Sequence, residues 1–355
     1  MHIGTNVQGK MVAALRRLGF DKVFDTDLSA DLTIMEEANE FIERVQGGGV
    51  LPMITSCSPG WIKYCEHYYP EQLRHLSTCK SPQQMFGAIC KTWYAKRMGL
   101  DPKDIVVVGI MPCTAKKFEA KLDNQNASGY PDVDIALTTR ELARMIDTAG
   151  IHFPKLPDEE FDNPLAESTG AAVIFGTTGG VMEAALRTAA DTLTGKDLPD
   201  VEFKEVRGTQ GIKEATYNIA GMEVNVCVAS GLANAHEIME KVKNGTANYH
   251  FIEIMACPGG CINGGGQPIQ HAVVRNFRDL KKLRAATLYE MDKNLPKRKS
   301  HQNESIKRIY EEFLGSPGSH KAHEVLHTSY VRRPKYKKLP PFFTAPDNLH
   351  RSGLI

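Results

Sequence analysis

Short apolar runs alternate along the chain with longer segments in which apolar residues recur every three or four positions. The short runs predict buried strands and the longer segments predict amphipathic helices. The predicted strands are 50–54 (VLPMI), 105–110 (IVVVGI), 133–137 (VDIAL), 171–175 (AAVIF), 251–255 (FIEIM) and a hairpin around 216–229 that turns at Ala220 and Gly221. The predicted helices are 8–18, 32–46, 82–98, 139–149, 180–194, 232–243 and 303–314. This alternation predicts an α/β fold with mostly parallel strands.

The composition is that of a water-soluble globular protein. Among 355 residues, 43 Lys and Arg stand against 42 Asp and Glu, so the net charge is +1 and no bulk charge favours nucleic acid. Hydrophobic residues at 42% and charged residues at 24% exclude wholesale disorder. No stretch approaches the roughly 18–20 apolar residues that span a bilayer. The start, MHIGTNVQGK, lacks the apolar core of a secretion signal, and we expect a cytoplasmic protein.

The eight cysteines fall into two groups. Cys65, Cys79, Cys90 and Cys227 lie in mixed sequence, where a free cysteine usually acts as a small buried hydrophobe. A chain of this length can bury a core without disulfides. The other four lie beside glycine, proline or serine and follow apolar runs: Cys57, Cys113, Cys257 and Cys261.

Three of the latter cysteines come two or three residues after a predicted strand: Cys57, Cys113 and Cys257. Because ligands of open α/β sheets bind beyond the carboxyl ends of strands, we expect these three loops to converge on one site. Four thiolates around a buried centre suit an iron–sulfur cluster or a structural zinc. Zinc sites use close pairs, and only Cys257 and Cys261 form one, so the spacing favours iron–sulfur. The glycines of CPGGCINGGG (257–266) let the backbone pass close to a bulky ligand.

Three long motifs carry a specific resemblance. TSCSPGW (55–61), MPCTAKKFE (111–119) and EIMACPGGCINGGGQP (253–268) resemble, in order and spacing, the signature stretches of [FeFe]-hydrogenases. The likeness extends across residues 4–330. It implies a [4Fe–4S] cluster joined to a two-iron centre that carries CO, cyanide and a bridging dithiolate, and the reversible formation of dihydrogen from two protons and two electrons. It also implies two lobes, each with a twisted, mostly parallel sheet flanked by helices, with the cluster between them.

The resemblance assigns roles residue by residue. Cys113, Cys257 and Cys261 match cluster ligands, and Cys261 matches the bridge to the two-iron centre. Lys116 matches a lysine that donates to cyanide, which is reasonable beside an anionic cluster. The residues that match the pocket walls are Gln83, Met111, Pro112, Phe175 and Met255. The residues that match the proton relay, leading outward, are Cys57, Glu37, Ser77, Glu40 and Arg44.

Spacing independently places part of this relay on one surface. Glu37, Glu40 and Arg44 lie three and four residues apart in the predicted helix 32–46, so they share one helix face. A solvated stripe of opposite charges is the alternative interpretation of this pattern. A buried relay would cost free energy because carboxylates are expensive in a low dielectric, so its presence favours proton turnover.

The first motif departs from the family at one position. The family has two adjacent cysteines there, and this chain has Cys57 followed by Ser58, which takes the position of a cluster ligand. A serine alkoxide could ligate iron, the loop could slip so that Cys57 ligates, or three cysteines could hold a labile cluster. We expect the serine to keep its position, because Pro59 and Trp61 anchor the loop beyond it.

The domain organisation follows from the resemblance. We expect a catalytic domain at 1–285 with lobes at roughly 1–130 and 131–270, small-subunit-like helices at 286–330, and a Pro/Lys/Arg-rich tail at 331–355. No CxxC-rich ferredoxin-type segment precedes the first motif, so electrons would come from ferredoxin or another carrier protein or subunit, and maturation proteins are further expected partners. His320, His323 and His327 have a helical spacing that could indicate a metal, but packing and surface positions are the simpler interpretation.

Three functions compete. A catalytic hydrogenase is the leading hypothesis, and the alternatives are a [4Fe–4S] protein with an assembly or structural role and a hydrogen sensor. Lys116, Glu37 and Cys57 favour catalysis, because a cluster cradle alone needs neither a cyanide donor nor a relay. The glycines of 176–180 match neither a dinucleotide fingerprint nor a P-loop, so nucleotide binding is rejected.

Overall fold

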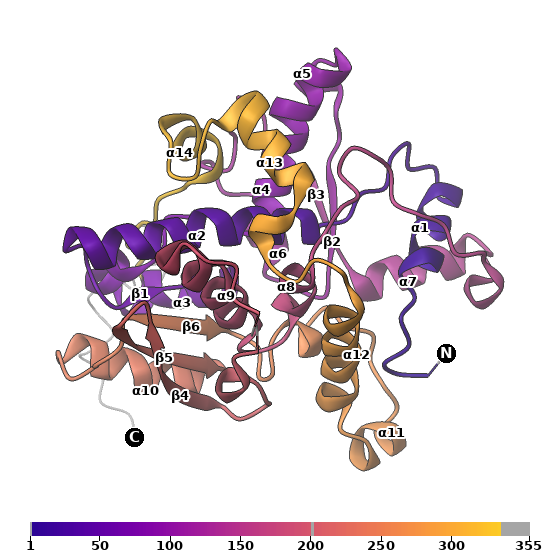
Figure 1. Ribbon diagram of the computed structural model, residues 1–355. Coiled ribbons are helices and arrows are strands. Elements are labelled where there is room, and N and C mark those ends of the chain that lie inside the picture. Colours follow the sequence, from indigo (N-terminus) through magenta and orange to yellow (C-terminus); the bar gives the residue numbers. More distant parts are fainter. Residues whose placement is uncertain (1, 200–201, 335–355) are drawn as a thin grey trace, which may run out of the picture.

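The computed structural model describes residues 2–199 and 202–334, and within them six strands form two sheets (Figure 1). The larger sheet has the order β1 (Met53–Ile54), β6 (Phe251–Met255), β5 (Met222–Ser230) and β4 (Ile212–Ile219). Its first three strands run parallel and β4 is antiparallel. The smaller sheet pairs β2 (Val108–Met111) with β3 (Ile135–Thr138) in parallel. The predicted α/β fold with parallel strands and flanking helices is confirmed.

The hairpin between β4 and β5 has the predicted turn. Ile219 pairs with Met222, and the two residues between them, Ala220 and Gly221, have φ values of 52° and 84°. Positive φ at both central residues is typical of the tight turns that match the right-handed twist of a hairpin. The hairpin supplies the outer edge of the larger sheet.

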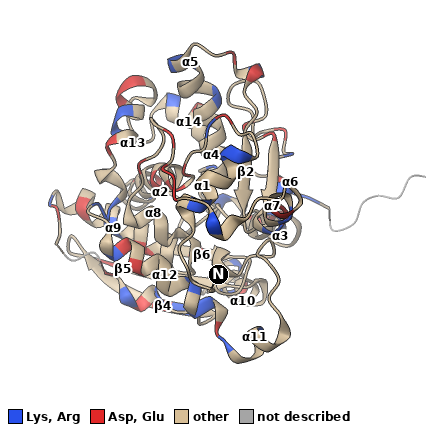
Figure 2. Cartoon of the chain, turned by 90° about the vertical axis from the view of Figure 1, so that its right-hand side faces the viewer, with Lys and Arg blue, Asp and Glu red and all other residues tan. Residues whose placement is uncertain are grey.

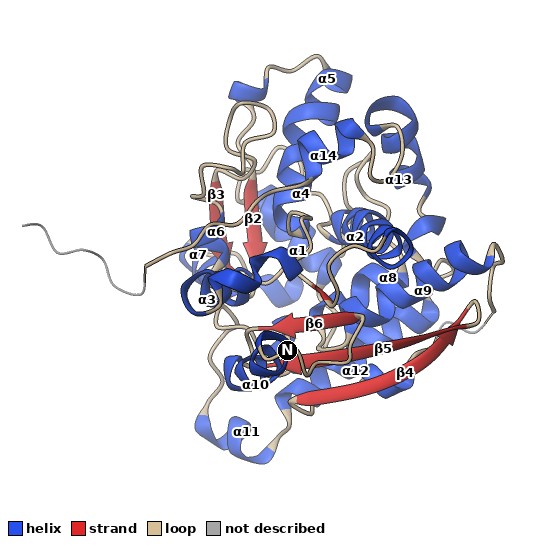
Figure 3. Ribbon diagram, turned by 90° about the vertical axis from the view of Figure 1, so that its left-hand side faces the viewer, coloured by secondary structure: helices blue, strands red, loops and turns tan. Residues whose placement is uncertain are grey.

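Alternate residues of β5 bury opposite faces of this sheet. Val226 and Val228 pack in the cluster formed with α2 (Asp27–Gly47) and α9 (Gly180–Thr194). Cys227 and Ala229 pack on the other side with α3 (Pro59–Tyr68) and α10 (Leu232–Lys243). Figures 1 and 3 show these helices on the two sides of the sheet. Both faces are therefore covered, as the apolar character of strand β6 requires.

Two further helices cover the smaller sheet. Val12 and Leu15 of α1 (Gln8–Arg17) pack against Leu142 and Ile146 of α7 (Thr139–Thr148) beside strand β2. The start of α7 is fixed by a capping box, in which Thr138 and Glu141 bond to each other's backbone N–H groups. This arrangement holds the end of β2, and the loop that follows it, in place.

The predicted helices are present, two of them with an internal π-helical turn. The helix predicted at 82–98 runs through α4 (Pro82–Ile89), a π turn at Cys90–Tyr94 and α5 (Ala95–Met98). The helix predicted at 303–314 consists of α13 (Glu304–Ile309) and a π turn at Tyr310–Leu314. Helix α2 begins at Asp27, before the predicted start at residue 32. The cysteines expected to be buried, Cys65, Cys79, Cys90 and Cys227, are buried and free.

One predicted strand is wrong. Residues 171–175 form the helix α8 (Gly170–Val173) and a 3₁₀ turn at Ile174–Gly176. A short apolar run buried on all sides does not distinguish a strand from a buried helix, and here α2 and α9 surround the segment. The helices α12 (Leu280–Asn294) and α14 (His320–Leu326) lie largely or wholly in the region 286–330 in which helices were expected. Helices not predicted are α3, α6 (Lys116–Glu119) and α11 (Ala272–Phe277).

The C-terminal helices wrap around the rest of the molecule. Helix α14 packs on α4, and α12 packs on α8. The start of the predicted tail lies on α3, where Arg333 and the Val331 N–H bond to Glu66. The remainder of that tail, from residue 335, lies outside the described residues. None of the described helices combines the length and apolar character needed to cross a membrane. In the view of Figure 2, acidic and basic residues are interspersed.

Candidate functional site

A cavity of about 800 Å³ lies where three parallel strands end. Cys57 and Ser58 reach it from the loop after β1, Cys113 from the loop after β2, and Cys257 and Cys261 from the loop after β6. The convergence predicted from strand-end spacing is therefore present: one cavity collects residues that are about 200 positions apart in sequence.

The spacing of the thiols fits a cluster better than a single ion. Within residues 2–199 and 202–334, the one group of three or more His, Cys, Asp or Glu ligand atoms within 4.8 Å of one another is Glu40, Cys79 and His327. The sulfurs of Cys113, Cys257 and Cys261 are thus more widely spread than zinc ligands, which lie about 2.3 Å from the metal. Thiols spread around a large cavity suit a [4Fe–4S] cluster.

The electrostatics of these thiols suit a cationic metal group. Burial, and then the neighbouring Cys113, raise the pKa of Cys261 to about 12. Burial also raises the pKa of Cys257. Thiols in such surroundings become thiolates when metal ions compensate their charge. The cysteines therefore lose their protons when an iron group binds.

Ser58 is tied to the loop that carries two of the cysteines. Its hydroxyl accepts a hydrogen bond from the Ala256 N–H at 3.2 Å, and Ala256 directly precedes Cys257. The serine also precedes α3, which begins at Pro59. Its neighbour Cys57 is influenced by Glu37, whose charge, after burial, raises the pKa of the Cys57 thiol. The two adjacent residues therefore have different neighbours. Ser58 is bonded to the loop that carries Cys257 and Cys261, whereas Cys57 lies near Glu37 of α2.

Lys116 lies in the cavity wall with a carboxylate that the sequence analysis missed. Its ammonium nitrogen lies 3.0 Å from Glu119 Oε2 and donates to the Cys57 carbonyl at 3.2 Å. Glu119 also accepts from the Ser81 hydroxyl at 2.9 Å. Since an ammonium group has three N–H donors, Lys116 can bond to Glu119 and to the Cys57 carbonyl and still donate a hydrogen bond to a group in the cavity. The three-residue spacing in KKFE was the signal that could have revealed Glu119.

The five predicted wall residues all line the cavity: Gln83, Met111, Pro112, Phe175 and Met255. Gln83 is buried, and neither atom of its side-chain amide has a hydrogen-bond partner within the described protein. An unpaired buried amide costs free energy unless a bound group satisfies it. The wall therefore combines soft apolar side chains with a polar group available to a ligand.

Two glycines of the loop after β6 allow a close approach between two protein loops, in addition to the approach to a ligand expected from the sequence. A Cβ atom on Gly264 would lie 1.9 Å from the Pro112 carbonyl oxygen, and one on Gly266 would lie 2.6 Å from the Cys113 nitrogen. These contacts are far below van der Waals distance. At these two positions glycine allows the loops after β2 and β6 to pack against each other, which fixes the position of Cys113 relative to Cys261.

The outer part of the predicted relay is connected by hydrogen bonds. Arg44 donates to Glu40 Oε1 at 2.6 Å, and the Ser77 hydroxyl donates to Glu40 Oε2 at 2.8 Å. Both Glu40 and Arg44 are largely buried, so the solvated-stripe interpretation does not apply to them. Helix α2 brings Glu37 and Glu40 inward because its other contacts, with α4 and α9, bury this part of the helix.

Glu37 is the unusual member of this group. Its side chain is buried and neither carboxyl oxygen has a hydrogen-bond partner within the described chain. Burial, followed by the charge of Glu40, raises the pKa of Glu37 to about 8, and the nearby Ser77 hydroxyl partly offsets this rise. The carboxyl group therefore holds a proton at neutral pH, between Cys57 on the cavity side and Ser77 on the outer side.

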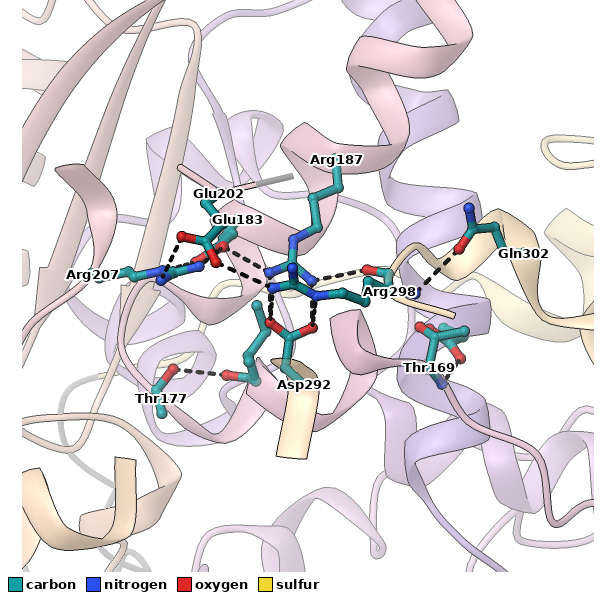
Figure 4. Close-up of polar contacts among 11 residues, drawn as sticks. Thr169, Thr177, Glu183, Arg187, Glu202, Arg207, Asp292, Arg298 and Gln302 are labelled. Atoms are coloured by element: carbon teal, nitrogen blue, oxygen red, sulfur yellow. Dashed lines mark hydrogen bonds and ion pairs between the residues drawn. The ribbon is translucent and has the colours of Figure 1, made fainter. Parts of the chain in front are cut away.

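Helix α12 supplies a cavity wall that sequence reasoning did not find. Arg284, Leu288 and Met291 line the cavity, and Arg284 donates to the Ile262 carbonyl in the cysteine loop at 2.7 Å. A charge network anchors the helix to α9 (Figure 4). In it, Arg187 bonds to Asp292 and to Glu183 at 2.8 Å each.

The three C-terminal histidines do not form a site together. His320 is exposed, and His323 stacks on His327 with ring centroids 4.0 Å apart. His327 Nε2 lies 3.1 Å from Glu36 Oε2. The packing interpretation is therefore the better one for the helical spacing, although His327 also approaches Glu40.

Two family models match the chain. The model of the iron only hydrogenase large subunit, C-terminal domain, covers residues 1–265, and that of the iron hydrogenase small subunit covers residues 278–333. The chain belongs to the iron-only hydrogenase family.

Relatives of this iron-only hydrogenase chain divide into two kinds. Iron hydrogenase 1 of Clostridium pasteurianum is 50% identical over 332 residues, which are 94% of this chain and 58% of that protein. A probable cytosolic Fe-S cluster assembly factor of Aedes aegypti is 34% identical over 332 residues, 90% of this chain and 68% of that protein. The chain thus spans little more than half the length of its Clostridium relative.

A solved structure supports the same membership in the iron-only hydrogenase family. An [FeFe]-hydrogenase variant from Chlamydomonas reinhardtii aligns with a TM-score of 0.81 and 41% identity, covering 93% of this chain and 89% of that one. At this identity and TM-score the two chains share the same fold. The finer chemistry of the site depends on its individual residues.

Proposed function

We propose that the chain catalyses the reversible formation of dihydrogen from two protons and two electrons at a [4Fe–4S]-linked two-iron centre. The observation that carries this proposal is the continuity between the cavity and a buried acid route. Cys57 and Lys116 line the same cavity as the cysteines, and Glu37, Ser77 and Glu40 follow outward from it. A protein that only stores or transfers a cluster has no need for this route.

The residues proposed to hold the cofactor divide between two subsites. Cys113, Cys257, Cys261 and Ser58 would hold the [4Fe–4S] cluster, with Cys261 shared. Lys116, Gln83 and the wall residues Met111, Pro112, Phe175 and Met255 would surround the two-iron centre. When bound, the group supplies the metal site at which protons and electrons combine. The protein's wall excludes water from it and its ammonium group compensates negative charge.

The proton route uses the chain's own atoms. Glu37 is neutral near pH 7 because burial raises its pKa to about 8, so it can give a proton inward to Cys57 and be reprotonated from Ser77. The Ser77 hydroxyl already bonds to Glu40 Oε2, and it relays a proton by exchanging one O–H bond for another. Arg44 keeps the outer carboxylate oriented with a 2.6 Å bond.

Electrons would come from a ferredoxin-type carrier or a cluster-bearing partner, and dedicated maturation proteins would supply the two-iron centre. A [4Fe–4S] protein with an assembly role is the second candidate function. Ser58 favours it, since an alkoxide is a harder donor than thiolate and would hold cluster iron less well. The 34% identity to an assembly factor is compatible with that candidate.

The test is dihydrogen evolution by anaerobically matured protein with a chemically reduced dye as electron donor. We expect turnover in the wild-type chain and its near-complete loss in Cys57→Ala, with the [4Fe–4S] spectrum retained. Loss of iron in Cys57→Ala would make Cys57 a ligand instead. A wild-type protein that holds both iron groups and evolves no dihydrogen would reject the proposal.

A further inference from the structure

The C-terminal end of α14 is joined to the strand-like segment that follows Ser77. Cys79 and His327 form an antiparallel backbone bridge. On either side, the Lys80 N–H donates to the Leu326 carbonyl and the Thr328 N–H donates to the Thr78 carbonyl, each at 2.8 Å. This pairing fixes part of the small-subunit-like region beside Glu40, although the two segments are far apart in sequence.

The pairing creates a compact side-chain group. Single ligand atoms of Glu40, Cys79 and His327 all lie within 4.8 Å of one another. The Cys79 thiol donates to Glu40 Oε2 at 3.8 Å, the same oxygen that accepts from Ser77. His327 contacts the Thr78 hydroxyl through Nδ1 at 2.8 Å. Beyond it, the exposed His323 ring stacks at 4.0 Å, so the group extends from the buried relay to solvent.

Arg44 and His327 both lie near Glu40, at the outer end of the relay, and they differ in their ability to carry protons. A guanidinium does not lose its proton in proteins, so Arg44 can orient Glu40 but is a poor proton carrier. An imidazole carries an N–H on one ring nitrogen and a lone pair on the other, so it can accept a proton and pass one on. His327 is thus better suited than Arg44 to exchange protons between Glu40 and water.

We propose that His327 is a proton entry and exit point of the relay, and that the small-subunit-like region thereby takes part in proton transfer. The proposal rests on the relay of the proposed function. In the inward direction, the His327 N–H bond breaks as an S–H bond forms at Cys79, and the former thiol proton passes to Glu40 Oε2. One proton moves inward, His327 regains one from water through the His323 side, and no electrons are transferred. The ligand atoms of Cys79 and His327 lie within 4.8 Å of each other, a gap that one bridging water can span.

The charges around His327 come from several elements. Glu36 and Glu40 face it from α2, Cys79 from the paired segment and His323 from α14. Tyr310, in the π turn after α13, bonds to Glu36. Glu36 is itself held by the Tyr310 hydroxyl and by the Gly318 N–H at 2.9 Å. Glu36 therefore serves as a fixed partner that positions the imidazole, while Glu40 belongs to the route.

The first test compares His327→Gln with His320→Gln in the cluster-loaded protein. Glutamine keeps a hydrogen-bonding side chain but cannot relay a proton as imidazole does. His320 is an exposed histidine at the start of α14, the helix that ends just before His327. We expect turnover to fall about 3- to 10-fold in His327→Gln, less than for loss of the whole relay because a route past Arg44 remains. Added imidazole should restore part of the rate, and the pH profile should change shape. His320→Gln should behave as wild type.

Unchanged turnover and pH profile in His327→Gln would overturn the proposal. So would a loss that imidazole does not restore and that accompanies a lower melting temperature, since that result indicates a structural role. The double variant with Arg44→Gln should lose more activity than either single variant if the two exits run in parallel.

A second test does not depend on turnover. Glu37 is protonated at neutral pH, so its carboxylic C=O band is visible in the infrared and can be assigned by its loss in Glu37→Gln. We expect hydrogen–deuterium exchange of this band to be slower in His327→Gln than in wild type and His320→Gln. Equal exchange rates in all three would overturn the proposal. Slower exchange in a chain without dihydrogen turnover would reject the proposed function and leave the proton exit supported.

Discussion

The α9–α12 charge network and the carboxylates of α2 both lie in the interior, but they differ in how their charges are satisfied. In the network, Arg187 bonds to Glu183 and Asp292, and these carboxylates also bond to Arg207 and Arg298 at 2.6 and 2.7 Å (Figure 4). On α2, Glu37 has no hydrogen-bond partner within the described residues. In the charge network the carboxylates of Glu183 and Asp292 each bond to arginines, whereas on α2 the buried Glu37 carboxyl group lacks a partner within the described residues.

The difference separates a structural from a functional use of buried charge. A fully paired network cannot release a proton without leaving a charge uncompensated, and it holds α12 against the cavity. An unpaired carboxyl group costs stability, and its raised pKa of about 8 is what a proton carrier near neutral pH needs. We infer that the chain tolerates the cost at Glu37 because the residue serves turnover.

Glu37→Gln should separate activity from stability most strongly. Glutamine has nearly the same shape but carries no exchangeable acid proton, so we expect dihydrogen turnover to fall about 10²- to 10⁴-fold. The melting temperature should stay the same or rise, because a charge-free amide replaces an acid that is costly to ionise. Glu43→Gln, an exposed acid on the same helix, is the control for both measurements. Retained turnover would place the proton route elsewhere.

Arg187→Met should show the opposite behaviour. Removing the central cation leaves Glu183 and Asp292 with less compensation, and we expect a loss of about 3 kcal/mol in the free energy of unfolding. Arg207 and Arg298 still contact the two carboxylates, which keeps the loss at the lower end for a buried pair. Denaturant unfolding of this variant and of Arg298→Met, at the more exposed edge of the network, would measure it. An equal loss in both would mean that the central position is not special.

The pH dependence of stability should also distinguish the two regions. The pKa of Glu37 is raised from 4.5 to about 8 on folding, so the folded state binds the proton more tightly than the unfolded state. Its contribution is therefore fully present below about pH 4.5 and is lost as pH rises towards 8. We expect wild type to lose about 2–4 kcal/mol relative to Glu37→Gln between pH 5 and 8. Melting curves at pH 5 and pH 8 would measure this difference. If Glu37 were already ionised at pH 5, the stabilities of wild type and Glu37→Gln would change equally between the two pH values.

Ser58→Cys gives a smaller effect, confined to the cluster side of the cavity. A thiolate matches cluster iron better than an alkoxide and is far easier to deprotonate, so we expect higher iron content or a shifted cluster potential. Iron and sulfide analysis with paramagnetic resonance on both forms would measure the change. Equal iron, spectra and activity would show that position 58 is not a ligand and that another group completes the site.

Local patterns predicted the parts of this site that depend on local structure. The cysteine loops were found because strand ends and turn residues are adjacent in sequence, and Glu37, Glu40 and Arg44 share a face through helical spacing alone. The run 171–175 was assigned to a strand because its apolar residues do not reveal whether helices or strands surround it. Its helical form depends on packing against α2 and α9.

Contacts between distant segments could not be predicted in the same way. The wall supplied by Met291 depends on how α12 docks. The position of His327 beside Glu40 depends on a backbone pairing between Cys79 and His327, which are 248 positions apart. Glu119 differs, since its spacing from Lys116 was visible in the sequence. The glycines after β6 were expected to let the backbone approach a bound ligand, and in the structure two of them also allow close packing against the backbone of the loop after β2.

We propose that this cavity holds a two-iron centre for dihydrogen chemistry, and infrared spectra of the chain after anaerobic maturation would detect the ligands of that centre. Protein vibrations do not obscure the region in which metal-bound CO and cyanide absorb. We expect strong bands from both ligands, weakened in Lys116→Ala because a charge-assisted hydrogen bond of about 1.5–3 kcal/mol is lost. A protein with a complete [4Fe–4S] cluster and no such bands would reject the two-iron centre and favour an assembly or structural role.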